Sequence, residues 1–304
     1  SKLEDYGKLA RLNLKGLKAG ARINLGEKRN ITDFALWKFS KKDEKRQMEW
    51  KSPWNESGFP GWHIECSAMS MKYLGNTFDI HCGGIDHITV HHTNEIAQSE
   101  AATGKKFVNY WLHGNFLVLK ESKMAKSGEF LTLQSLIEKG YSAMDYRYFC
   151  LNAHYRQELT FTYEALDSAK ISYSKLKEYI LEIKKSENKG ESTNKYREKF
   201  IQAINDDLNM PRGLAVVWDL IKDSKIDNKD KYKTLIEFDK VLGLNLDKVK
   251  EEKIDKEVNK LLEEREKARK QGNFELADRI RKQIMDKGYI IEDTKEGIKI
   301  RKNV

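Results

Sequence analysis

Histidine and cysteine are concentrated in one short stretch of this sequence. Residues 61–101 contain two of the three cysteines and five of the seven histidines. The other two histidines, His113 and His154, follow shortly after, and none comes later. Imidazole and thiolate groups bind borderline-soft metals, and imidazole exchanges protons near neutral pH. The pattern therefore predicts that the chemistry of this protein lies in the first half of the chain.

Three residues in this stretch form a candidate zinc set. His91 and Glu95 are four residues apart in a predicted helix at 91–102, which places both side chains on one face. Cys66 lies upstream in another predicted helix, at 63–73. A thiolate, an imidazole and a carboxylate suit zinc, although three ligands leave a tetrahedral site incomplete. The same residue types also occur in surface ion pairs and as buried cysteines, so the residues alone leave both readings open.

The order of predicted elements indicates the fold class. A short buried strand at 78–84 ends at two glycines, a helix follows at 91–102, and a second strand is expected at 111–119. This alternation predicts an α/β layer with parallel strands. From residue 131 onward the pattern is helical, and only Pro211 interrupts it. Apolar residues follow helical spacing at 165–181 and 199–223, and loops are expected at 184–195 and 223–231.

The two ends of the chain have their own patterns. The first thirty residues mix glycine with charge and predict an irregular arm, after which 31–39 is expected to be ordered. Residues 50–61 crowd tryptophan, proline and glycine into one predicted loop. Near the other end, 258–287 predicts two helices broken at 271–273, and the tail predicts a hairpin that turns near 295–297.

Composition bounds the class of protein and its partners. The 304 residues carry a formal net charge of +9, which suits a polyanionic partner such as nucleic acid, although solvated lysines explain it equally well. No window approaches the ~20 apolar residues that span a bilayer. No secretory signal opens the chain, and three cysteines do not make a disulfide framework. We therefore expect a cytoplasmic location and no membrane partner.

Three motifs in the first half carry a family resemblance. GWHIECSAM at 61–69, FDIHCGGID at 78–86 and HHTNEIAQSEA at 91–101 resemble the second catalytic half of cysteinyl-tRNA synthetase, a class I aminoacyl-tRNA synthetase. The resemblance implies that Cys66, His91 and Glu95 are three of four ligands to one zinc ion per chain. The fourth ligand in the family is a cysteine that nothing here matches. Cys82 stands where the family has glycine, and we interpret it as an incidental substitution rather than a spare thiol near the metal.

The same resemblance assigns substrate contacts. Trp62, His81 and Asp86 match family positions around the bound cysteine, whereas His63 and His92 are expected to support the fold or the metal ligands. Zinc would distinguish cysteine from serine because a soft metal prefers a thiolate to a hydroxyl. An apolar pocket would separate these two amino acids poorly.

A lysine pentad follows the second predicted strand and resembles the class I signature Lys-Met-Ser-Lys-Ser. The residues are Lys123, Met124, Ala125, Lys126 and Ser127, with alanine in place of the first serine. The resemblance implies that the pentad binds ATP, which would be accompanied by Mg²⁺, and that both lysines are catalytic. Lysines that contact the leaving pyrophosphate best in the transition state accelerate adenylate formation. Taken alone, two lysines three residues apart are more often an ordinary basic turn.

The second half resembles the RNA-binding parts of the family. Residues 206–220 resemble its helical bundle and residues 265–302 its anticodon-binding domain. Arg269, Phe274, Asp278 and Asp293 fall on positions that contact anticodon bases in relatives. An aromatic ring can stack on an unpaired base, and carboxylates accept hydrogen bonds from base amino groups. Phe274 stands where tryptophan is usual, and Arg269 would otherwise belong to a solvated helix face.

The resemblance runs from Ser1 to Val304 and implies a domain order. We expect the second half of a Rossmann-type catalytic domain with the zinc site at 1–110, of which 1–55 is a connective segment. A stem-contact-like region at 111–165 includes the lysine pentad. A helical bundle at 166–250 and a small α+β anticodon-binding domain at 251–304 complete the chain. The fold class is thus α/β plus all-α.

The implied activity is ATP-dependent formation of cysteinyl-adenylate and transfer of cysteine to tRNA(Cys) by a monomeric enzyme. The family's His-Ile-Gly-His element and the first strands of its nucleotide-binding fold have no match in this sequence. We therefore expect a C-terminal portion of a longer enzyme that is inactive by itself.

The sequence leaves two alternatives to this activity. The first is a cysteine ligase of mycothiol synthesis, which shares the activation site but lacks the anticodon-like tail, so 258–304 argues against it. The second is a zinc-stabilised tRNA-binding module without catalytic activity. Adenylate formation would discriminate the second from an enzyme.

Overall fold

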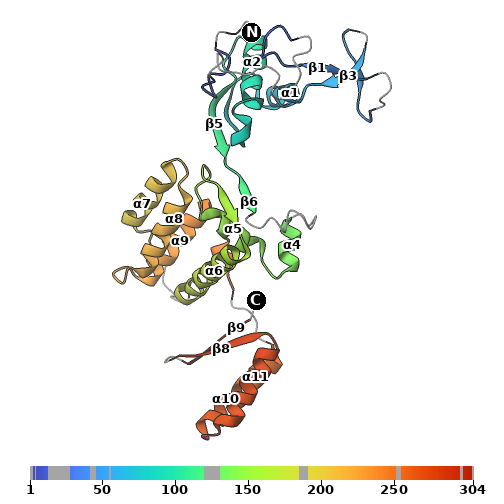
Figure 1. Cartoon of the computed structure of the whole chain (residues 1–304). Helices are drawn as coiled ribbons and strands as arrows, with labels where there is room; N and C mark the ends of the chain where they lie inside the picture. The colour runs from blue at the N-terminus through green and yellow to red at the C-terminus, as the bar shows by residue number, and fades with distance from the viewer. Residues whose placement is uncertain are drawn as a thin grey trace. The chain divides into compact units, whose positions relative to one another are not determined.

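The computed structural model describes residues 3, 5–12, 28–41, 46–54, 56–119, 131–184, 191–250, 255–294 and 297–302, without the side chains of 292–299, 301 and 302. The chain divides into two compact units, drawn in Figure 1. The first comprises Ser1–Val118 and Tyr155–Leu159, and the second comprises Leu119–His154 and Thr160–Val304. None of the described helices has the length and apolar composition needed to cross a membrane.

The first unit contains the parallel strand pair that the sequence predicts. Strands β4 (Phe78–Gly84) and β5 (Val108–Gly114) run parallel, with His81 opposite Trp111. The 3₁₀ turn η2 (Ile85–His87) follows β4 directly, and helix α2 (His91–Thr103) leads back toward β5. A small apolar core of Phe78, Phe107 and Val108 anchors the pair. The α/β expectation for this region is therefore confirmed.

Helix α1 (Trp62–Leu74) lies beside α2 and has well-defined ends. It begins after the extended residue Gly61 and ends at Gly75, whose φ is +90°. Helix α2 ends at Gly104 in the left-handed region, and the Gly104 N–H bonds back to the carbonyl of Glu100. Glycine favours this position because it has no Cβ to clash there. Both helices match the predicted ranges to within two residues.

A three-stranded antiparallel sheet precedes α1. Its strands are β1 (Trp37–Phe39), β2 (Trp50–Lys51) and β3 (Ser57–Pro60), in the order β1-β3-β2. Our prediction of a single loop at 50–61 was therefore wrong, because two strands lie within it. Strands of two to four residues are too short to show alternation in the sequence. Gly58 is required at the centre, since a Cβ there would meet the Lys38 carbonyl and the Trp37 indole.

The predicted strand at 111–119 is two strands. Strand β5 ends at Gly114, and β6 (Leu117–Leu119) pairs instead with β7 (Leu159–Phe161). Between them Asn115 donates its N–H to the carbonyl of Tyr155, so the backbone changes its hydrogen-bond partner at this point. Strand β7 also corrects the expectation that the chain is helical from residue 131 to the predicted tail hairpin.

The second unit begins as a helical bundle. Its helices are α4 (Leu133–Glu138), α5 (Ala143–Leu151), α6 (Tyr163–Lys184), α7 (Asn194–Asn205), α8 (Met210–Lys222) and α9 (Asn228–Leu242), followed by the turn η3 (Leu246–Lys248). The rings of Phe200 and Phe238 stack with centroids 4.1 Å apart in its core. The helical expectation for this region is confirmed.

One predicted helix in the bundle is interrupted. The apolar run at 199–223 breaks between α7 and α8, where Asp207 and Leu208 have φ values of +55° and +56°. Pro211 lies in the first turn of α8, so it starts a helix rather than interrupting one. Helix α9 begins at Asn228, which shortens the loop expected at 223–231.

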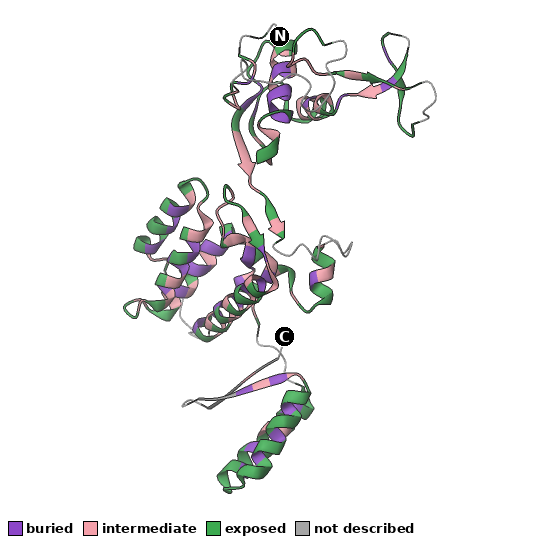
Figure 2. Ribbon diagram, viewed as in Figure 1, coloured by how far each residue is buried: buried purple, intermediate pink, exposed green. Residues whose placement is uncertain are grey.

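The remainder of the chain is a helix pair followed by a hairpin. Helices α10 (Lys256–Lys270) and α11 (Phe274–Asp286) are separated at 271–273, as predicted. Strands β8 (Tyr289–Thr294) and β9 (Gly297–Lys302) then pair antiparallel. One apolar cluster joins these parts; its buried members are Val258, Ile280, Ile284, Tyr289 and Ile291. Figure 2 shows that most of the remaining surface of the two helices is exposed.

Candidate metal centre

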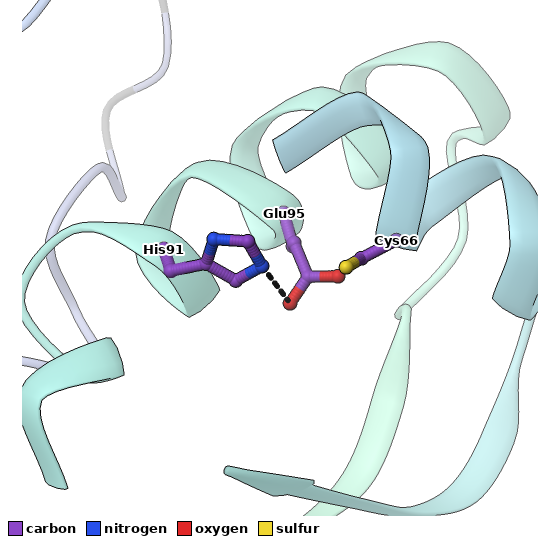
Figure 3. Close-up of side chains that lie close together, drawn as sticks. All are labelled: Cys66, His91 and Glu95. Atoms are coloured by element: carbon purple, nitrogen blue, oxygen red, sulfur yellow. Dashed lines mark ion pairs between the residues drawn. The ribbon is translucent and has the colours of Figure 1, made fainter. Parts of the chain in front are cut away.

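The three residues of the candidate zinc set converge between two helices. Helix α1 supplies Cys66, and α2 supplies His91 and Glu95 from one face. One potential ligand atom of each residue lies within 4.8 Å of the other two. Figure 3 shows the Cys66 sulfur and the His91 ring turned toward the Glu95 carboxylate. The three residues of the candidate set therefore lie together, and their binding of a zinc ion stays a prediction.

Glu95 is the most informative of the three. It is fully buried, with 0% of its surface exposed. Its Oε2 accepts a hydrogen bond from Nε2 of His81 at 3.0 Å, whereas its Oε1 has no hydrogen-bond partner among the described residues. An unsatisfied buried carboxylate oxygen costs free energy. A cation between Glu95, His91 and Cys66 would satisfy this oxygen, so the residues present fit a metal ion.

The histidine hydrogen bonds favour the same arrangement. Nδ1 of His63 lies 3.0 Å from Nδ1 of His91, so one of these nitrogens donates and the other accepts. This contact occupies Nδ1 of His91 and leaves Nε2, 4.0 Å from Glu95, as the nitrogen available to a metal. A hydrogen bond to the second ring nitrogen is the usual way in which a ligating histidine is oriented.

The pKa shifts of the histidines in the cluster favour metal ligation, whereas that of Cys66 opposes it. Burial lowers the pKa of His91, and burial together with the charges of His81 and His113 lowers the pKa of His92 to about 3. Neutral imidazole is the form that binds metals. Burial, followed by the charges of Glu95 and Glu65, raises the pKa of the Cys66 thiol. A metal would therefore have to displace a proton from this sulfur on binding.

A second set of potential ligands overlaps the first. His81 and His92 bring ligand atoms within 4.8 Å of each other and of Glu95. Nε2 of His92 lies 3.8 Å from the Glu95 carboxylate, and its Nδ1 lies 2.8 Å from Nε2 of His113. Both sets need Glu95. Only the first offers a thiolate, the softer ligand, and so it is the better zinc set.

The residues expected to contact cysteine lie in different settings. Trp62 is 61% exposed, and its ring centroid lies 4.7 Å from that of His91. His81 bonds to Glu95, as described. Asp86 is exposed in η2 at the end of β4, and none of the described contacts joins it to the ligand triad. The structure thus brings Trp62 and His81 to the candidate centre but leaves Asp86 beside it.

Cys82 is exposed on β4. Adjacent residues of a strand point to opposite faces. Cys82 therefore points away from the side on which His81 contacts Glu95 and on which a Cβ at Gly83 would meet the His92 ring. This geometry favours the incidental substitution over a spare thiol for the metal.

The lysine pentad lies outside the described residues. Its members are Lys123, Met124, Ala125, Lys126 and Ser127. Their contact with ATP therefore stays a prediction.

Two of the four candidate RNA contacts, Arg269 and Phe274, flank the turn between α10 and α11. Arg269 lies in the last turn of α10, and Phe274 opens α11 with 64% of its surface exposed. Asp278 follows Phe274 by four residues, so both lie on one face of α11. The side chain of Asp293, in β8, is outside the described part of the chain. The base contacts of all four residues stay predictions.

Sequence reasoning missed the polar residues that join α1 to α2. Ser67 is the residue after Cys66, and Gln98 and Ser99 lie one turn beyond Glu95. The side chains of Gln98 and Ser99 both donate hydrogen bonds to Oγ of Ser67. Polar residues adjoining predicted ligands were the available signal, but serine and glutamine are common on exposed helix faces.

Comparison with known families identifies the class. The sequence model of the tRNA synthetases class I (C) catalytic domain matches residues 1–171. The DALR domain matches 199–247, and the cysteinyl-tRNA ligase anticodon binding domain matches 251–301. The first match covers more than half of the chain, which therefore belongs to the class I (C) tRNA synthetase family.

Three curated relatives that match this chain are cysteine–tRNA ligases. Cysteine–tRNA ligase 1 of Burkholderia lata is 50% identical over 301 residues, which is 98% of this chain and 63% of that protein. The cysteine–tRNA ligase of Treponema denticola is 46% identical over 96% of the chain and 66% of its own length. The cysteine–tRNA ligase of Borrelia hermsii is 38% identical over 99% of the chain and 68% of its own length. The chain thus spans about two thirds of the length of these relatives.

Proposed function

We propose that this chain provides the cysteine-selecting metal site and the RNA-binding part of a cysteine–tRNA ligase. Such an enzyme activates cysteine with ATP and transfers it to tRNA(Cys). The observation that carries the proposal is the convergence of Cys66, His91 and the buried Glu95, whose Oε1 has no hydrogen-bond partner among the described residues. The names of the relatives support the substrate, and the anticodon-binding match at 251–301 favours tRNA over the mycothiol acceptor.

The proposed metal is one zinc ion per chain, held by Cys66, His91 and Glu95. Zinc, when bound, supplies a soft site that accepts the sulfur of cysteine in preference to the hydroxyl of serine. His81 orients the Glu95 carboxylate through its hydrogen bond. His63 orients the His91 ring in the same way. The indole of Trp62, which is exposed and contacts the His91 ring, would contact the bound amino acid.

The same proposal assigns roles to the lysine pentad, the helical bundle and the C-terminal segment. Lys123 and Lys126 would contact the phosphates of ATP as point charges, together with Mg²⁺. The helical bundle at 166–250 would position the tRNA, and 251–304 would read its anticodon. We further propose that the protein works in the cytoplasm as a monomer.

The test is ligand selection at the metal. The chain is loaded with Co²⁺, whose absorption reports sulfur ligation, and titrated with L-cysteine, L-serine and S-methyl-L-cysteine. We expect L-cysteine to bind more tightly than L-serine by well over the roughly 100-fold that an apolar pocket achieves. S-methyl-L-cysteine should behave like serine because it cannot form a thiolate.

Two results would contradict the proposal. One is equal affinity for cysteine and serine in the metal-loaded chain. The other is retention of the same cobalt spectrum in Cys66→Ala, which would show that this sulfur is not a ligand. Free cysteine also binds Co²⁺ in solution. Equilibrium dialysis of Cys66→Ala with cysteine therefore serves as the control, because it separates protein-bound cobalt from these complexes.

A further inference from the structure

A group of polar contacts joins α1 to α2 beside the candidate metal ligands. Nε2 of Gln98 donates to the carbonyl of His63 at 2.6 Å and to Oγ of Ser67. Oγ of Ser99 donates to the same Ser67 oxygen at 2.9 Å. The carbonyl of His63 can only accept, so it fixes which end of the Gln98 amide faces α1. We refer to Ser67, Gln98 and Ser99 as the polar clamp.

The clamp is adjacent to the ligands in sequence and in space. Ser67 follows Cys66, while Gln98 and Ser99 lie three and four residues after Glu95. Ser67 and Ser99 are each only 1% exposed. Buried hydrogen bonds have a preferred length and direction, whereas apolar contacts do not. The clamp can therefore fix the position of α1 along the axis of α2. An apolar interface would define this position less sharply.

A tetrahedral metal site requires this kind of control. Bonds of about 2.0–2.3 Å to zinc place neighbouring ligand atoms about 3.5 Å apart. The candidate ligand atoms, which come from two separate helices, lie within 4.8 Å of one another. A slip of one helix by about an ångström would open the site, since such constellations must be held to within ~0.5 Å.

We propose that Ser67, Gln98 and Ser99 are positioning residues that set the distance of Cys66 from His91 and Glu95. The inference rests on the metal site of the proposed function, to which it adds the device that holds the two ligand-bearing helices in register. The clamp touches neither metal nor substrate and acts only through the helices that it joins.

The first experiment compares zinc affinities by competition with a chelator. Gln98→Met keeps an unbranched side chain of similar length but loses the amide. Ser99→Val and Ser99→Thr are nearly isosteric with each other and differ in the hydroxyl. We expect Gln98→Met and Ser99→Val to bind zinc roughly 10–100-fold more weakly, an effect as large as the loss of a hydrogen bond to a ligand, because the shifted helix moves Cys66 away from His91 and Glu95. Ser99→Thr should stay close to the parent affinity.

The controls separate positioning from folding. All affinities are measured at a temperature at which circular dichroism shows each variant to be fully folded. Gln202→Met, at an exposed site on α7, is the matched control and should bind zinc like the parent. A Gln98→Met chain that is less stable to heat but binds zinc as tightly as the parent would overturn the proposal, because the clamp would then be purely structural.

The second experiment needs no metal. Iodoacetamide alkylation is followed by mass spectrometry of tryptic peptides, in which Cys66 falls on 52–72 and the exposed Cys82 on 73–105. We expect Gln98→Met to raise the Cys66 rate several-fold, because α1 is released from α2. The Cys82 rate should not change. An unchanged Cys66 rate would also overturn the proposal.

These experiments distinguish failure of the clamp from failure of the metal site. If Cys66→Ala binds zinc as tightly as the parent, the proposed metal set is wrong, and a raised Cys66 rate in Gln98→Met would still support the clamp. If Cys66→Ala loses zinc while Gln98→Met changes neither affinity nor rate, the metal set stands and the clamp is refuted.

Discussion

Two helix pairs in this chain differ in the kind of contact that joins their helices. Helices α1 and α2 meet through buried polar groups, which include Ser67, Ser99 and the carboxylate of Glu95. Helices α10 and α11 meet through an apolar cluster that includes Val258 and Ile284. The first pair hides its candidate functional groups at the contact, whereas the second exposes them on its surface. In the proposed function, the first pair would enclose a metal ion and the second would present side chains to tRNA.

This contrast determines whether a mutation can change function without changing stability. In the first pair a change to a functional group also alters the helix contact, because both occupy the same buried space. In the second pair the apolar cluster holds the helices together, and an exposed residue such as Phe274 can be removed without disturbing it. Mutations should therefore have coupled effects in one pair and separable effects in the other.

The largest effect is expected at Glu95. Glu95→Gln removes the charge from the buried carboxylate and should lower zinc affinity at least about 1,000-fold, since losing an outer partner alone costs roughly 10–100-fold. Chelator competition measures this change. Glu65→Gln, an exposed change on α1, is the control and should leave zinc affinity nearly unaltered. Similar losses in both variants would mean that general negative charge, not Glu95, attracts the ion.

A large effect on stability is expected at Ile284, which is fully buried between α10 and α11. Ile284→Ala should lower the local free energy of unfolding by about 2–5 kcal/mol, through lost burial and the cavity left behind. Hydrogen exchange of the amides in α10 and α11 reports this quantity. Met285→Ala is the matched control because Met285 is 52% exposed. Zinc affinity should not change in Ile284→Ala. A fall in zinc affinity would contradict the idea that the two helix pairs respond independently to mutation.

An intermediate effect is expected on RNA binding at Phe274. Phe274→Ala should weaken binding of an anticodon stem-loop by roughly 1–3 kcal/mol, the range for loss of one stacked base. Hydrogen exchange and zinc affinity should stay unchanged because the ring is exposed. Fluorescence anisotropy with labelled RNA provides the measurement, with Met285→Ala as an exposed control on the same helix. Equal binding by Phe274→Ala and the parent would remove this ring from the RNA contact.

The smallest effect is expected at the start of α11. Oδ1 of Asn273 accepts a hydrogen bond from the N–H of Leu276 at 3.1 Å and caps the helix. Asn273→Ala should cost about 1 kcal/mol in local stability, and Asn273→Gly only a few tenths. Hydrogen exchange of the first turn of α11 can resolve the two. If both variants match the parent, the cap contributes nothing to the presentation of Phe274.

Much of the metal-site region could be predicted from the sequence because its signals are local. The i, i+4 spacing of His91 and Glu95 placed both on one helix face, and the two glycines that close the strand at 78–84 marked its end. The hydrogen bond between Glu95 and His81 could not be predicted, because it depends on how α2 packs beside β4. The polar clamp was missed for the same reason.

The errors elsewhere arose where short elements depend on distant partners. Strands β2 and β3 have two and four residues, so their pairing, not their sequence, defines them. The break between α7 and α8 requires positive φ at Leu208, a conformation that leucine rarely adopts and that its sequence does not signal. The division of the chain into four functional segments stays a prediction.

X-ray absorption at the zinc edge of the metal-loaded chain tests the metal site most directly. We expect one sulfur at about 2.3 Å, from Cys66, with nitrogen and oxygen ligands at about 2.0–2.2 Å. Addition of L-cysteine should raise the sulfur count to two, and addition of L-serine should not. A shell of nitrogen and oxygen alone would contradict this site, because it would place the ion on His81, His92 and Glu95 and leave Cys66 without a role in selecting cysteine.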